Sequence, residues 1–476
     1  MVLMSYGIII LAAGNGRRMT SNIPKVLHKL AGIPILFRSL NAALGVAMIK
    51  QVVVVGGSDL NALKQACSSM IFHQENMMDK ISWAHQSVPM GTADAVAVGL
   101  AAINKDITNI IVLSGDIPLI TSNTLNKLIS NTAPQAIGIV TGNIIEPTGL
   151  GRIIRDKNNN FLQIIDEADA SLMQKKITEI NVGIYLFPQQ VLMQLLPQIN
   201  HNNTQQEYYL TDIFELAIKE NISICTISLD NPLENLSVNT RRQLIELERA
   251  YQVQQAMDLI EQGVTIIDPH RFDVRGEVKI SKDVEIDINV ILVGKVVIES
   301  GAKIGANCYI KDTLIGADVI VQPHSVIEGA IIHARSIIGP FARIRPNTNI
   351  GCNTKIGNFV EIKAATIGEN SKINHLSYVG DAIIGNQVNI GAGTITCNYD
   401  GVNKHTTVIE DQVLVGAGCQ LIAPITIEKQ ATLAAGTTLM HNAPSSKLTL
   451  NKKIQYSVEW QRPTKDKTAK QISAEI

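Results

Sequence analysis

The sequence of 476 residues has little that would tie it to a membrane or to a nucleic acid. No stretch reaches the roughly 18 apolar residues that a spanning helix needs, and no basic cluster precedes the apolar run near the N-terminus. The 41 basic and 42 acidic residues leave a net charge of −1. This balance gives no electrostatic reason to expect a nucleic acid or an anionic membrane as a partner. We therefore expect a soluble, cytoplasmic protein.

Cysteines and aromatic residues are also scarce. The six cysteines lie far apart and include no C-x-x-C pair: Cys67, Cys225, Cys308, Cys352, Cys397 and Cys419. This spacing favours reduced thiols over a disulfide framework or a cysteine-ligated zinc site. Aromatic residues make up 4% of the chain whereas hydrophobic residues reach 46%, so aliphatic side chains must form most of the core. The length predicts two or three domains.

The first half of the chain has the pattern of an α/β fold. Short aliphatic runs alternate with more polar segments up to about Thr240. The runs "YGIIILAA", "QVVVVGG", "NIIVLSGD" and "QAIGIV" are continuous, which is typical of parallel strands buried on both faces. Ligands of such a sheet bind at the carboxyl ends of its strands. We expect one domain over residues 1–241, with its site at that edge.

A long helix is expected next. Apolar residues recur at roughly helical spacing and no proline interrupts them: Leu244, Ile245, Leu247, Tyr251 and Met257. This pattern predicts a helical linker over residues 242–262.

Residues 263–476 follow a different rule, in which an aliphatic residue recurs every six positions. The long runs are Ile338, Ile344, Ile350, Ile356 and Ile362, and then Ile409, Val415, Leu421, Ile427, Leu433 and Leu439. A six-residue period predicts a parallel β-helix. The interruption from Thr396 to Ile409 predicts a loop that leaves the coil, and the polar tail beyond Pro463 is expected to be disordered.

The stretch "LAAGNGRRMTSNIPKVLH" places glycines and cations directly after the first strand. Gly14 and Gly16 would let the backbone approach a phosphate, and Arg18 and Lys25 would neutralise its charge. The stretch is not a Walker A loop, which needs G-x-x-x-x-G-K, and it lacks the third glycine of a dinucleotide fingerprint. An ordinary strand–turn–helix is the alternative to a phosphate site of another kind.

Together with "PKVL", "SGDIPL", "TGLGRI", "EINVGIY" and "QQEYYLTDI", this stretch resembles the uridylyltransferase half of the bifunctional N-acetylglucosamine-1-phosphate uridylyltransferases/glucosamine-1-phosphate N-acetyltransferases. The resemblance implies that a sugar-phosphate oxygen attacks the α-phosphorus of UTP and that pyrophosphate leaves. Such a reaction needs positioning and charge neutralisation and no protein nucleophile. The resemblance also implies Mg²⁺ as a cofactor, held by Asp116 and Asn239.

The resemblance assigns further residues of this site. Arg18 and Lys25 are the expected catalytic residues, which hold the nucleotide phosphates. The expected contacts to UTP and UDP-N-acetylglucosamine are Leu11, Ala12, Ala13, Gly14, Lys25, Gln86, Gly91, Thr92, Ser114, Gly115, Asp116, Gly151, Asp166, Asn181 and Asn239. In this set the uracil contacts are Gln86, Gly91 and Thr92, and the amino-sugar contacts are Gly151, Asp166 and Asn181. The chain departs from the family pattern at Asn15, Ala93, Asp94, Ser114 and Asp166.

Two cations in the repeat region have a spacing that suggests a bound anion. Arg345 and Lys363 are 18 residues apart, which is one full coil if the helix is triangular. Their side chains should then lie about 4.8 Å apart on one face, the usual distance between neighbouring strands. Two cations this close repel each other unless an anion lies between them. The spacing therefore favours a phosphate clamp over solvated surface charge.

The same coils contain "NHLSYVGD", whose His375 is suited to accept a proton near neutral pH. With His324 and His333 it raises a zinc site as an alternative, which we discount because the three histidines stand in different sequence contexts. The strings "GPFARIRP", "GNFVEIKAATIG" and "VNIGAGTITCNYDG" instead resemble the acetyltransferase half of the same family, in which the amine of glucosamine 1-phosphate attacks the thioester of acetyl-CoA.

In this second half the resemblance implies that His375 is the general base and that Glu361 orients it. Glucosamine 1-phosphate would be bound by Arg345, Lys363, Tyr378 and Asn389. Acetyl-CoA would be bound by Ala392, Asn398, Tyr399, Ala417, Ala435 and Lys452. Ala417 and Lys452 replace a serine and an arginine of the family pattern, and lysine lacks the bidentate geometry of arginine. Weaker binding of acetyl-CoA is therefore expected.

The resemblance thus implies a bifunctional enzyme that makes UDP-N-acetylglucosamine, a precursor of peptidoglycan and lipopolysaccharide. The implied fold is a Rossmann-like nucleotidyltransferase domain joined by a long helix to a left-handed β-helix that forms a homotrimer. One alternative is a nucleotidyltransferase for another sugar, with a regulatory β-helix. Another is a non-catalytic sugar-nucleotide sensor. The intact His375, Arg345 and Lys363 argue against the first alternative, and the presence of both Asp116 and His375 argues against the second.

Overall fold

The computed structural model describes residues 4–14, 16–71, 79–201, 203, 206–451 and 457–460. The chain divides into two compact units, residues 1–312 and 313–476. The domain boundaries expected from the sequence stay predictions, because this division follows packing and not activity. Asn15, Lys452 and the tail beyond Pro463 lie outside the described residues. None of the helices in the described ranges is long and apolar enough to cross a membrane.

The first unit is built on a sheet of buried aliphatic strands. These are β1 (Tyr6–Ala12), β4 (Ile49–Gly56), β5 (Ile81–His85), β6 (Asn109–Ser114), β7 (Ile137–Asn143), β10 (Glu179–Pro188) and β11 (Ile224–Ser228). The strand order is β11–β7–β10–β6–β1–β4–β5. Neighbours are parallel except at β10, which runs antiparallel to β6 and β7. The four continuous runs of the sequence form β1, β4, β6 and β7, and these strands are almost entirely buried.

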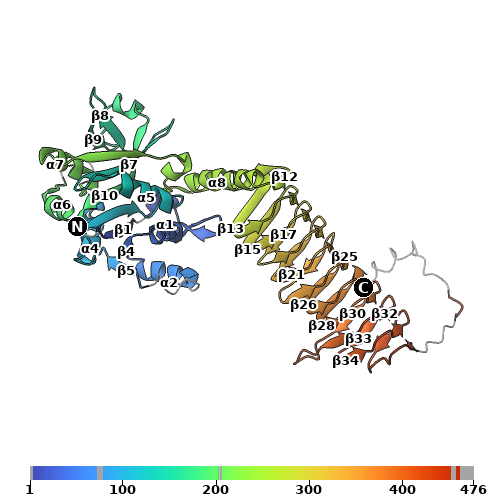
Figure 1. The fold of residues 1–476 in the computed structure, drawn as a ribbon. Helices are drawn as coiled ribbons and strands as arrows, with labels where there is room; N and C mark the ends of the chain where they lie inside the picture. The colour runs from blue at the N-terminus through green and yellow to red at the C-terminus, as the bar shows by residue number, and fades with distance from the viewer. Residues whose placement is uncertain are drawn as a thin grey trace, which may run out of the picture. The chain divides into compact units, whose positions relative to one another are not determined.

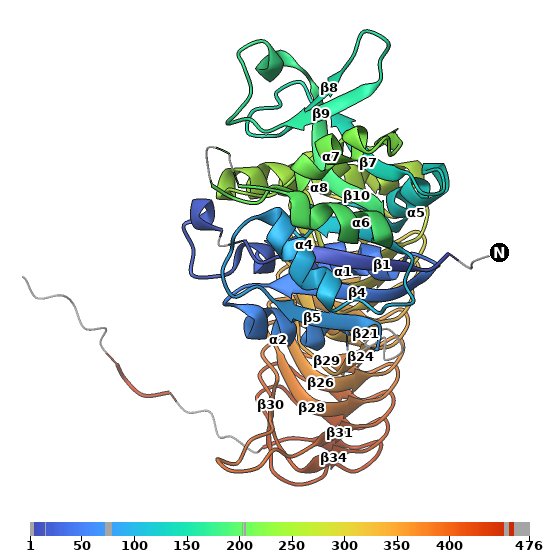
Figure 2. The ribbon, with the colours of Figure 1, turned by 90° about the vertical axis from the view of Figure 1, so that its left-hand side faces the viewer.

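Helices cover this sheet, and smaller strands extend from it. The helices are α1 (Ile35–Leu44), α2 (Leu60–Ile71), α4 (Thr92–Ala101), α5 (Ser122–Asn131), α6 (Gln189–Leu195), α7 (Ile213–Lys219) and α8 (Arg241–Glu261). The smaller strands are β2 (Lys29–Leu30), β3 (Ile33–Pro34), β8 (Arg152–Arg155) and β9 (Phe161–Ile165). Figure 2 shows β8 and β9 as a ribbon that stands out beyond β7 and β10. This ribbon carries the segment between Gly151 and Asp166.

Helix α8 begins at a capping box, in which Thr240 and Gln243 bond to each other's backbone N–H groups. Leu247 is buried in a cluster with Met19, Leu30 and Val238. Ile245 and Met257, by contrast, are exposed although both fit the helical spacing seen in the sequence. The helix therefore buries a different face from the one that its apolar residues alone would indicate.

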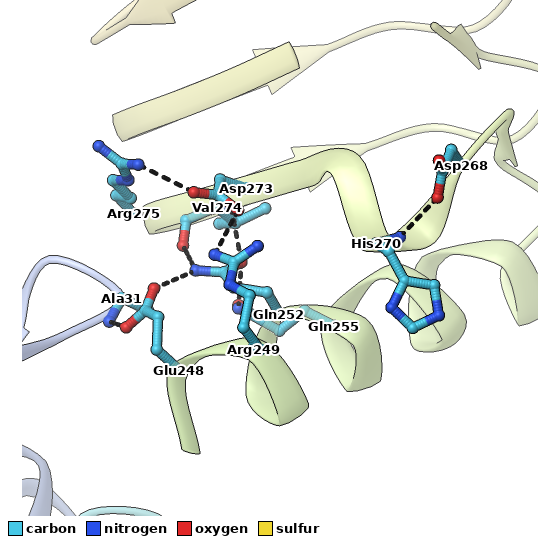
Figure 3. Close-up of polar contacts among 10 residues, drawn as sticks. All are labelled: Ala31, Glu248, Arg249, Gln252, Gln255, Asp268, His270, Asp273, Val274 and Arg275. Atoms are coloured by element: carbon cyan, nitrogen blue, oxygen red, sulfur yellow. Dashed lines mark hydrogen bonds and ion pairs between the residues drawn. The ribbon is translucent and has the colours of Figure 1, made fainter. Parts of the chain in front are cut away.

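The first coils of the β-helix belong to the same unit and begin next to α8 (Figure 1). Their strands are β12 (Thr265–Ile266), β13 (Phe272–Ile280), β14 (Glu285–Ile286), β15 (Val290–Ile298), β16 (Lys303–Ile304) and β17 (Tyr309–Lys311). Strand β13 pairs with β15 on one side. Its other edge is met by Gln252 of α8, whose amide bonds to both the N–H and the C=O of Val274 at 2.8 Å (Figure 3). Gln252 thus supplies hydrogen bonds that a preceding coil would otherwise make.

The second unit also consists of coils. Its strands are β18 (Leu314–Ile315), β19 (Ile320–Val321), β20 (Val326–Glu328), β21 (Ala330–Ile332), β22 (Ile337–Ile338), β23 (Arg343–Ile344), β24 (Thr348–Ile350), β25 (Lys355–Asn358), β26 (Glu361–Ile367), β27 (Lys372–His375), β28 (Tyr378–Ile384), β29 (Asn389–Ile390), β30 (Ile395–Cys397), β31 (Thr407–Ile409), β32 (Leu414–Val415), β33 (Gln420–Ile422), β34 (Ile425–Ile427), β35 (Thr432–Leu433), β36 (Thr438–Leu439) and β37 (Leu448–Thr449). Figure 2 shows β24, β26, β28, β31 and β34 stacked in this order.

The six-residue period is the period of the coil interior. Every member of the two long aliphatic runs is buried, as at Ile344, Ile362 and Leu421. Parallel pairing stacks each on its counterpart one coil away, for example Ile344 on Ile362. The β-helix expected from the sequence is confirmed, and the segment between β30 and β31 leaves the coil as predicted.

One corner of the second unit changes character along its length. Its residues have positive φ, and in successive coils they are His324, Phe341, Phe359, Leu376, Gly393, Gly418 and Gly436. The rings of His324 and Phe341 stack at 4.9 Å, and those of Phe341 and Phe359 at 5.4 Å. We call His324, Phe341, Phe359 and Leu376 the aromatic ridge, and the following three positions the glycine corner. His324, one of the three histidines considered for a zinc site and discounted, is part of this stack.

The contact between Gln252 and β13 generates a stability prediction. Gln252→Ala should lower the free energy of unfolding by about 2 kcal/mol, because it leaves the buried N–H and C=O of Val274 without partners. Urea denaturation measures this change. Gln254→Ala is the matched control, since Gln254 lies on the exposed side of α8 and its side chain bonds only to Asp258 among the described residues. Equal effects of the two substitutions would contradict the capping role.

Candidate active sites

A pocket of about 250 Å³ opens at the carboxyl edge of the sheet in the first unit. Register pairing brings Leu11 at the end of β1 beside Ser114 at the end of β6. The N–H of Gly115 then donates to the carbonyl of Leu11 at 2.9 Å, which ties the two strand ends together. The pocket is lined by Leu11, Ala12, Ala13, Gly14, Lys25, Val26, Gln86, Pro89, Gly91, Thr92, Ala95, Ser114, Asp116 and Glu207.

Charged and amide groups converge on the Lys25 ammonium in this pocket. Its Nζ lies 2.5 Å from Oδ2 of Asp116 and 3.0 Å from Oδ1 of Asn239. Arg18 also donates to Oδ1 of Asn239, at 3.1 Å, and Ser114 donates to Oδ1 of Asp116 at 2.6 Å. Two side-chain oxygens from distant parts of the chain therefore face one positive charge.

Backbone contacts explain how Asn239 reaches this point. The N–H of Val238 donates to the carbonyl of Asp116 at 2.9 Å, so the segment before α8 lies along the end of β6. Asn239 directly precedes Thr240, the residue that caps α8. The start of the helix and the end of the strand thus fix the amide of Asn239 against the carboxylate of Asp116.

This donor set is suited to a magnesium ion. Mg²⁺ prefers oxygen ligands, takes one or two from the protein and completes its shell with water and phosphate oxygens. Asp116 supplies a carboxylate oxygen and Asn239 an amide oxygen, and the Lys25 ammonium already stands as a cation between them. The residues present therefore fit the group that the sequence led us to expect.

The other end of the pocket is formed by the segment before α4. Gly91 has φ 121°, and a Cβ there would lie 2.5 Å from the carbonyl oxygen of Tyr208, so a side chain does not fit. The N–H of Tyr208 donates to Met90 and its carbonyl accepts from Ala93, both at 2.9 Å. Thr92 uses its hydroxyl oxygen to accept from the N–H of Leu210 at 2.9 Å. The segment at 206–210 thus braces this end of the pocket.

The three expected amino-sugar residues come together on the β8–β9 ribbon and β10. The N–H of Asn181 donates to the carbonyl of Gly151 at 2.9 Å. Asp166 directly follows β9, whose Ile165 pairs with Arg152 of β8. Asp166 lines a second pocket of about 370 Å³, together with Asp169, Tyr209, Asp212 and Glu215. These acidic neighbours were not singled out from the sequence.

In the second unit His375 pairs with a residue that the sequence did not indicate. Its Nδ1 lies 2.8 Å from Oδ1 of Asn358, its register partner one coil away. Glu361, expected to orient His375, instead accepts a hydrogen bond from Arg345 at 2.8 Å. The reason is register, because Glu361 pairs along the coil with Arg343 and Tyr378 and not with His375.

The spacing of Arg345 and Lys363 gives the expected neighbours. Ile344 and Ile362 are register partners, and the N–H of Arg345 donates to the carbonyl of Ile362 at 2.8 Å. Nζ of Lys363 lies 3.6 Å from Oδ2 of Asp381. Contact with the amine of Lys404 raises the pKa of Lys363 and lowers that of Lys404, and Asp381 further favours the charged form of Lys363. Lys404 is a third basic group that sequence reasoning missed, although it lies in the predicted loop.

Five of the six residues expected to contact acetyl-CoA belong to the described part of the chain, and they lie near the glycine corner and in the loop after β30. The N–H of Gly393 donates to the carbonyl of His375, that of Gly418 to Ala392, and that of Gly436 to Ala417. Ala392, Ala417 and Ala435 directly precede these glycines. The coils that come after His375 in the sequence therefore carry small residues at this corner. Asn398 donates to Asp381, whereas Tyr399 is exposed. Of the residues expected to bind glucosamine 1-phosphate, Tyr378 begins β28 and Asn389 begins β29.

The structure brings many of the residues expected at the nucleotide site together in the first pocket, and their roles stay predictions. The pocket lining adds Val26, Pro89, Ala95 and Glu207 to the residues expected there. Glu207 lies in the string "QQEYYLTDI", and nothing else in the sequence indicated that it would line this pocket. Arg18 is not part of this lining and contacts the site through its hydrogen bond to Oδ1 of Asn239.

Comparisons with known proteins bear on both halves. A family model described as the MobA-like NTP transferase domain matches residues 8–175, and one described as the GMPPB C-terminal domain matches residues 274–348 and 330–421. A protein of Methylococcus capsulatus is 45% identical over 96% of this chain and 97% of its own length. Proteins of Acinetobacter baylyi and Pseudomonas entomophila are each 43% identical, over 97% and 98% of this chain and 99% and 100% of their own lengths. All three carry the name "Bifunctional protein GlmU".

The second pocket generates a prediction on pH. Burial, together with Glu215 and Asp169, raises the pKa of Asp212 from 3.8 to about 6. The folded protein therefore binds a proton that the unfolded chain has lost, and the stability from this group falls as the pH rises from about 4 through 6. Asp212→Asn should be more stable than the wild type at pH 7, and this advantage should shrink as the pH falls to 4. The measurement is the difference in Tm across this range.

Asp156→Asn is a control of opposite sign. Hydrogen bonds from Asn160 lower the pKa of Asp156, so its carboxylate stabilises the fold once ionised. This variant should lose stability relative to the wild type at pH 7. A Tm difference for Asp212→Asn that does not change with pH would contradict the prediction.

Proposed function

Because this chain belongs to the GlmU family of bifunctional proteins, we propose that its two sites carry out successive steps of UDP-N-acetylglucosamine synthesis. One site acetylates glucosamine 1-phosphate with acetyl-CoA. The other transfers UMP from UTP to N-acetylglucosamine 1-phosphate and releases pyrophosphate. The observation that supports the second step best is the convergence of Asp116 and Asn239 on one cation at the end of the pocket.

In the uridylyl transfer the protein acts by positioning and by charge. Lys25 and Arg18 neutralise the phosphates of UTP, while the phosphate oxygen of the sugar attacks the α-phosphorus and pyrophosphate leaves. Asp116 and Asn239 would hold Mg²⁺, which neutralises phosphate charge when bound. Lys25 would then exchange its contact with Asp116 for contacts with phosphate oxygens. The uracil contacts are Gln86, Gly91 and Thr92. The sugar contacts are Gly151, Asp166 and Asn181.

In the acetyl transfer His375 is the general base. It takes a proton from the amine of glucosamine 1-phosphate as the nitrogen attacks the thioester carbonyl, and it returns this proton to the sulfur of CoA, which leaves as its thiol. The 2.8 Å contact between Nδ1 and Asn358 holds the ring and leaves Nε2 for the substrate. Arg345, Lys363 and Lys404 bind the sugar phosphate, for which Glu361 and Asp381 give up their present contacts. Acetyl-CoA extends along the glycine corner, where small residues leave room.

The aromatic ridge supports the homotrimer expected from the sequence. Phe341 and Phe359 are 47% and 56% exposed, and their φ angles of 56° and 55° are costly for bulky side chains. Asn or Gly would relieve this cost, so the aromatic rings need another reason to be there. Contact with a second copy of the chain supplies one. Because Leu376 of the ridge is next to His375, a second copy on the ridge would also border the acetyltransferase site.

The two activities can be separated by substitution. His375→Ala should lower the rate of CoA release from acetyl-CoA and glucosamine 1-phosphate by about 10²–10⁴-fold and leave pyrophosphate release intact. Asp116→Ala should abolish pyrophosphate release from UTP, N-acetylglucosamine 1-phosphate and Mg²⁺ and spare CoA release. Each variant is thus the control for the other. Pyrophosphate release without any CoA release by the wild type would leave the β-helix as a scaffold or regulator.

The role of the ridge is tested by the oligomeric state. The double variant Phe341→Asn/Phe359→Asn should sediment as a monomer in analytical ultracentrifugation, whereas the wild type sediments as a trimer. Asn is accepted at positive φ, so the coil itself should stay folded. Ile145→Asn, an exposed apolar site in the first unit, is the control and should remain trimeric. A trimeric double variant would place the interface elsewhere.

A further inference from the structure

A close contact between Gln86 and Asp94 has no role in the reactions described above. Gln86 directly follows β5, is only 4% exposed and lines the first pocket. Asp94 lies in the first turn of α4, where the helix N-terminus favours a carboxylate. Nε2 of Gln86 and Oδ2 of Asp94 are 2.6 Å apart.

Both N–H donors of the Gln86 amide are used within the protein. Nε2 donates to Asp94 and also, at 3.3 Å, to the carbonyl of Gly91. A primary amide has two N–H donors and one acceptor oxygen. Oε1 of Gln86 accepts no hydrogen bond from the part of the chain that the structure describes, and it is therefore the group that the side chain offers to a ligand.

The chemistry of the two partners fixes this orientation. A carboxylate and a backbone carbonyl can only accept hydrogen bonds. If the amide were turned over, its oxygen would face two further oxygens, and two buried N–H groups would lose their partners. Of the two partners, only Asp94 can be changed by substitution.

We propose that Asp94 determines base selectivity by holding the Gln86 amide with its oxygen toward the pocket. This inference rests on the proposed function, in which Gln86 contacts the base of the nucleotide. An acceptor at this position favours a base with a ring N–H, such as N3–H of uracil. Cytosine has an unprotonated N3, so two acceptors would face each other and remain unpaired in a buried site. Sites built to pair with an N–H reject analogues that lack it.

The experiment compares UTP with CTP. Values of kcat/KM are measured for both nucleotides with the full-length protein, Mg²⁺ and N-acetylglucosamine 1-phosphate. The wild type should prefer UTP strongly. Asp94→Ala frees the amide to turn over, and the UTP:CTP ratio of kcat/KM should fall about tenfold. Asp94→Asn keeps an acceptor oxygen for Nε2 and should retain most of the ratio.

Asp106→Asn is the matched control. It removes a carboxylate that bonds to Lys50 at an exposed site of the same unit, and it should leave the ratio unchanged. An unchanged ratio in Asp94→Ala would overturn the proposal. Equal use of CTP and UTP by the wild type would also overturn the proposal, and this measurement does not depend on the folding of any variant. Failure of the wild type to release pyrophosphate from UTP would instead overturn the proposed function itself.

Discussion

Parallel strand pairing is the constraint on which both sites depend. In the sheet it aligns the end of β1 with the end of β6, so that the glycine stretch and Asp116 meet although about a hundred residues separate them. In the coil it aligns Asn358 with His375, and Ile344 with Ile362. Consecutive parallel strands must be joined by a long connection, so residues that are far apart in the sequence become neighbours. Catalytic and binding side chains therefore lie together where the strands end.

Three of the cations proposed to bind phosphates are already paired with carboxylates. Lys25 contacts Asp116 at 2.5 Å, Arg345 contacts Glu361 at 2.8 Å and Lys363 lies 3.6 Å from Asp381. Each carboxylate neutralises its cation, so that neighbouring cations do not repel one another. The Arg345–Glu361 pair is about 40% exposed on each side and contributes little to stability. Exchanging its carboxylate for a phosphate therefore costs little.

Helix α8 links several of these features within the first unit. Its N-terminal cap adjoins Asn239, Leu247 packs against Met19 and Leu30, and Gln252 closes the edge of β13. Glu248 also accepts the N–H of Ala31 at 2.6 Å, and so contacts the segment that follows Lys25 (Figure 3). A single helix thus supports the nucleotide pocket with one end and the first coil with its middle.

The sequence by itself determined the fold class, and its resemblance to a known family determined the reaction class. Continuous aliphatic runs predicted the buried strands, the six-residue period predicted the β-helix, and the 18-residue spacing predicted that Arg345 and Lys363 are neighbours. These features repeat along the chain, so they can be read locally. The tertiary structure decided which side chains meet: Asn358 and not Glu361 beside His375, Lys404 beside Lys363, and Asp94 beside Gln86. It also decided that α8 exposes Ile245 and Met257. Such contacts depend on register and on what packs against each surface, which residue spacing within one segment does not encode.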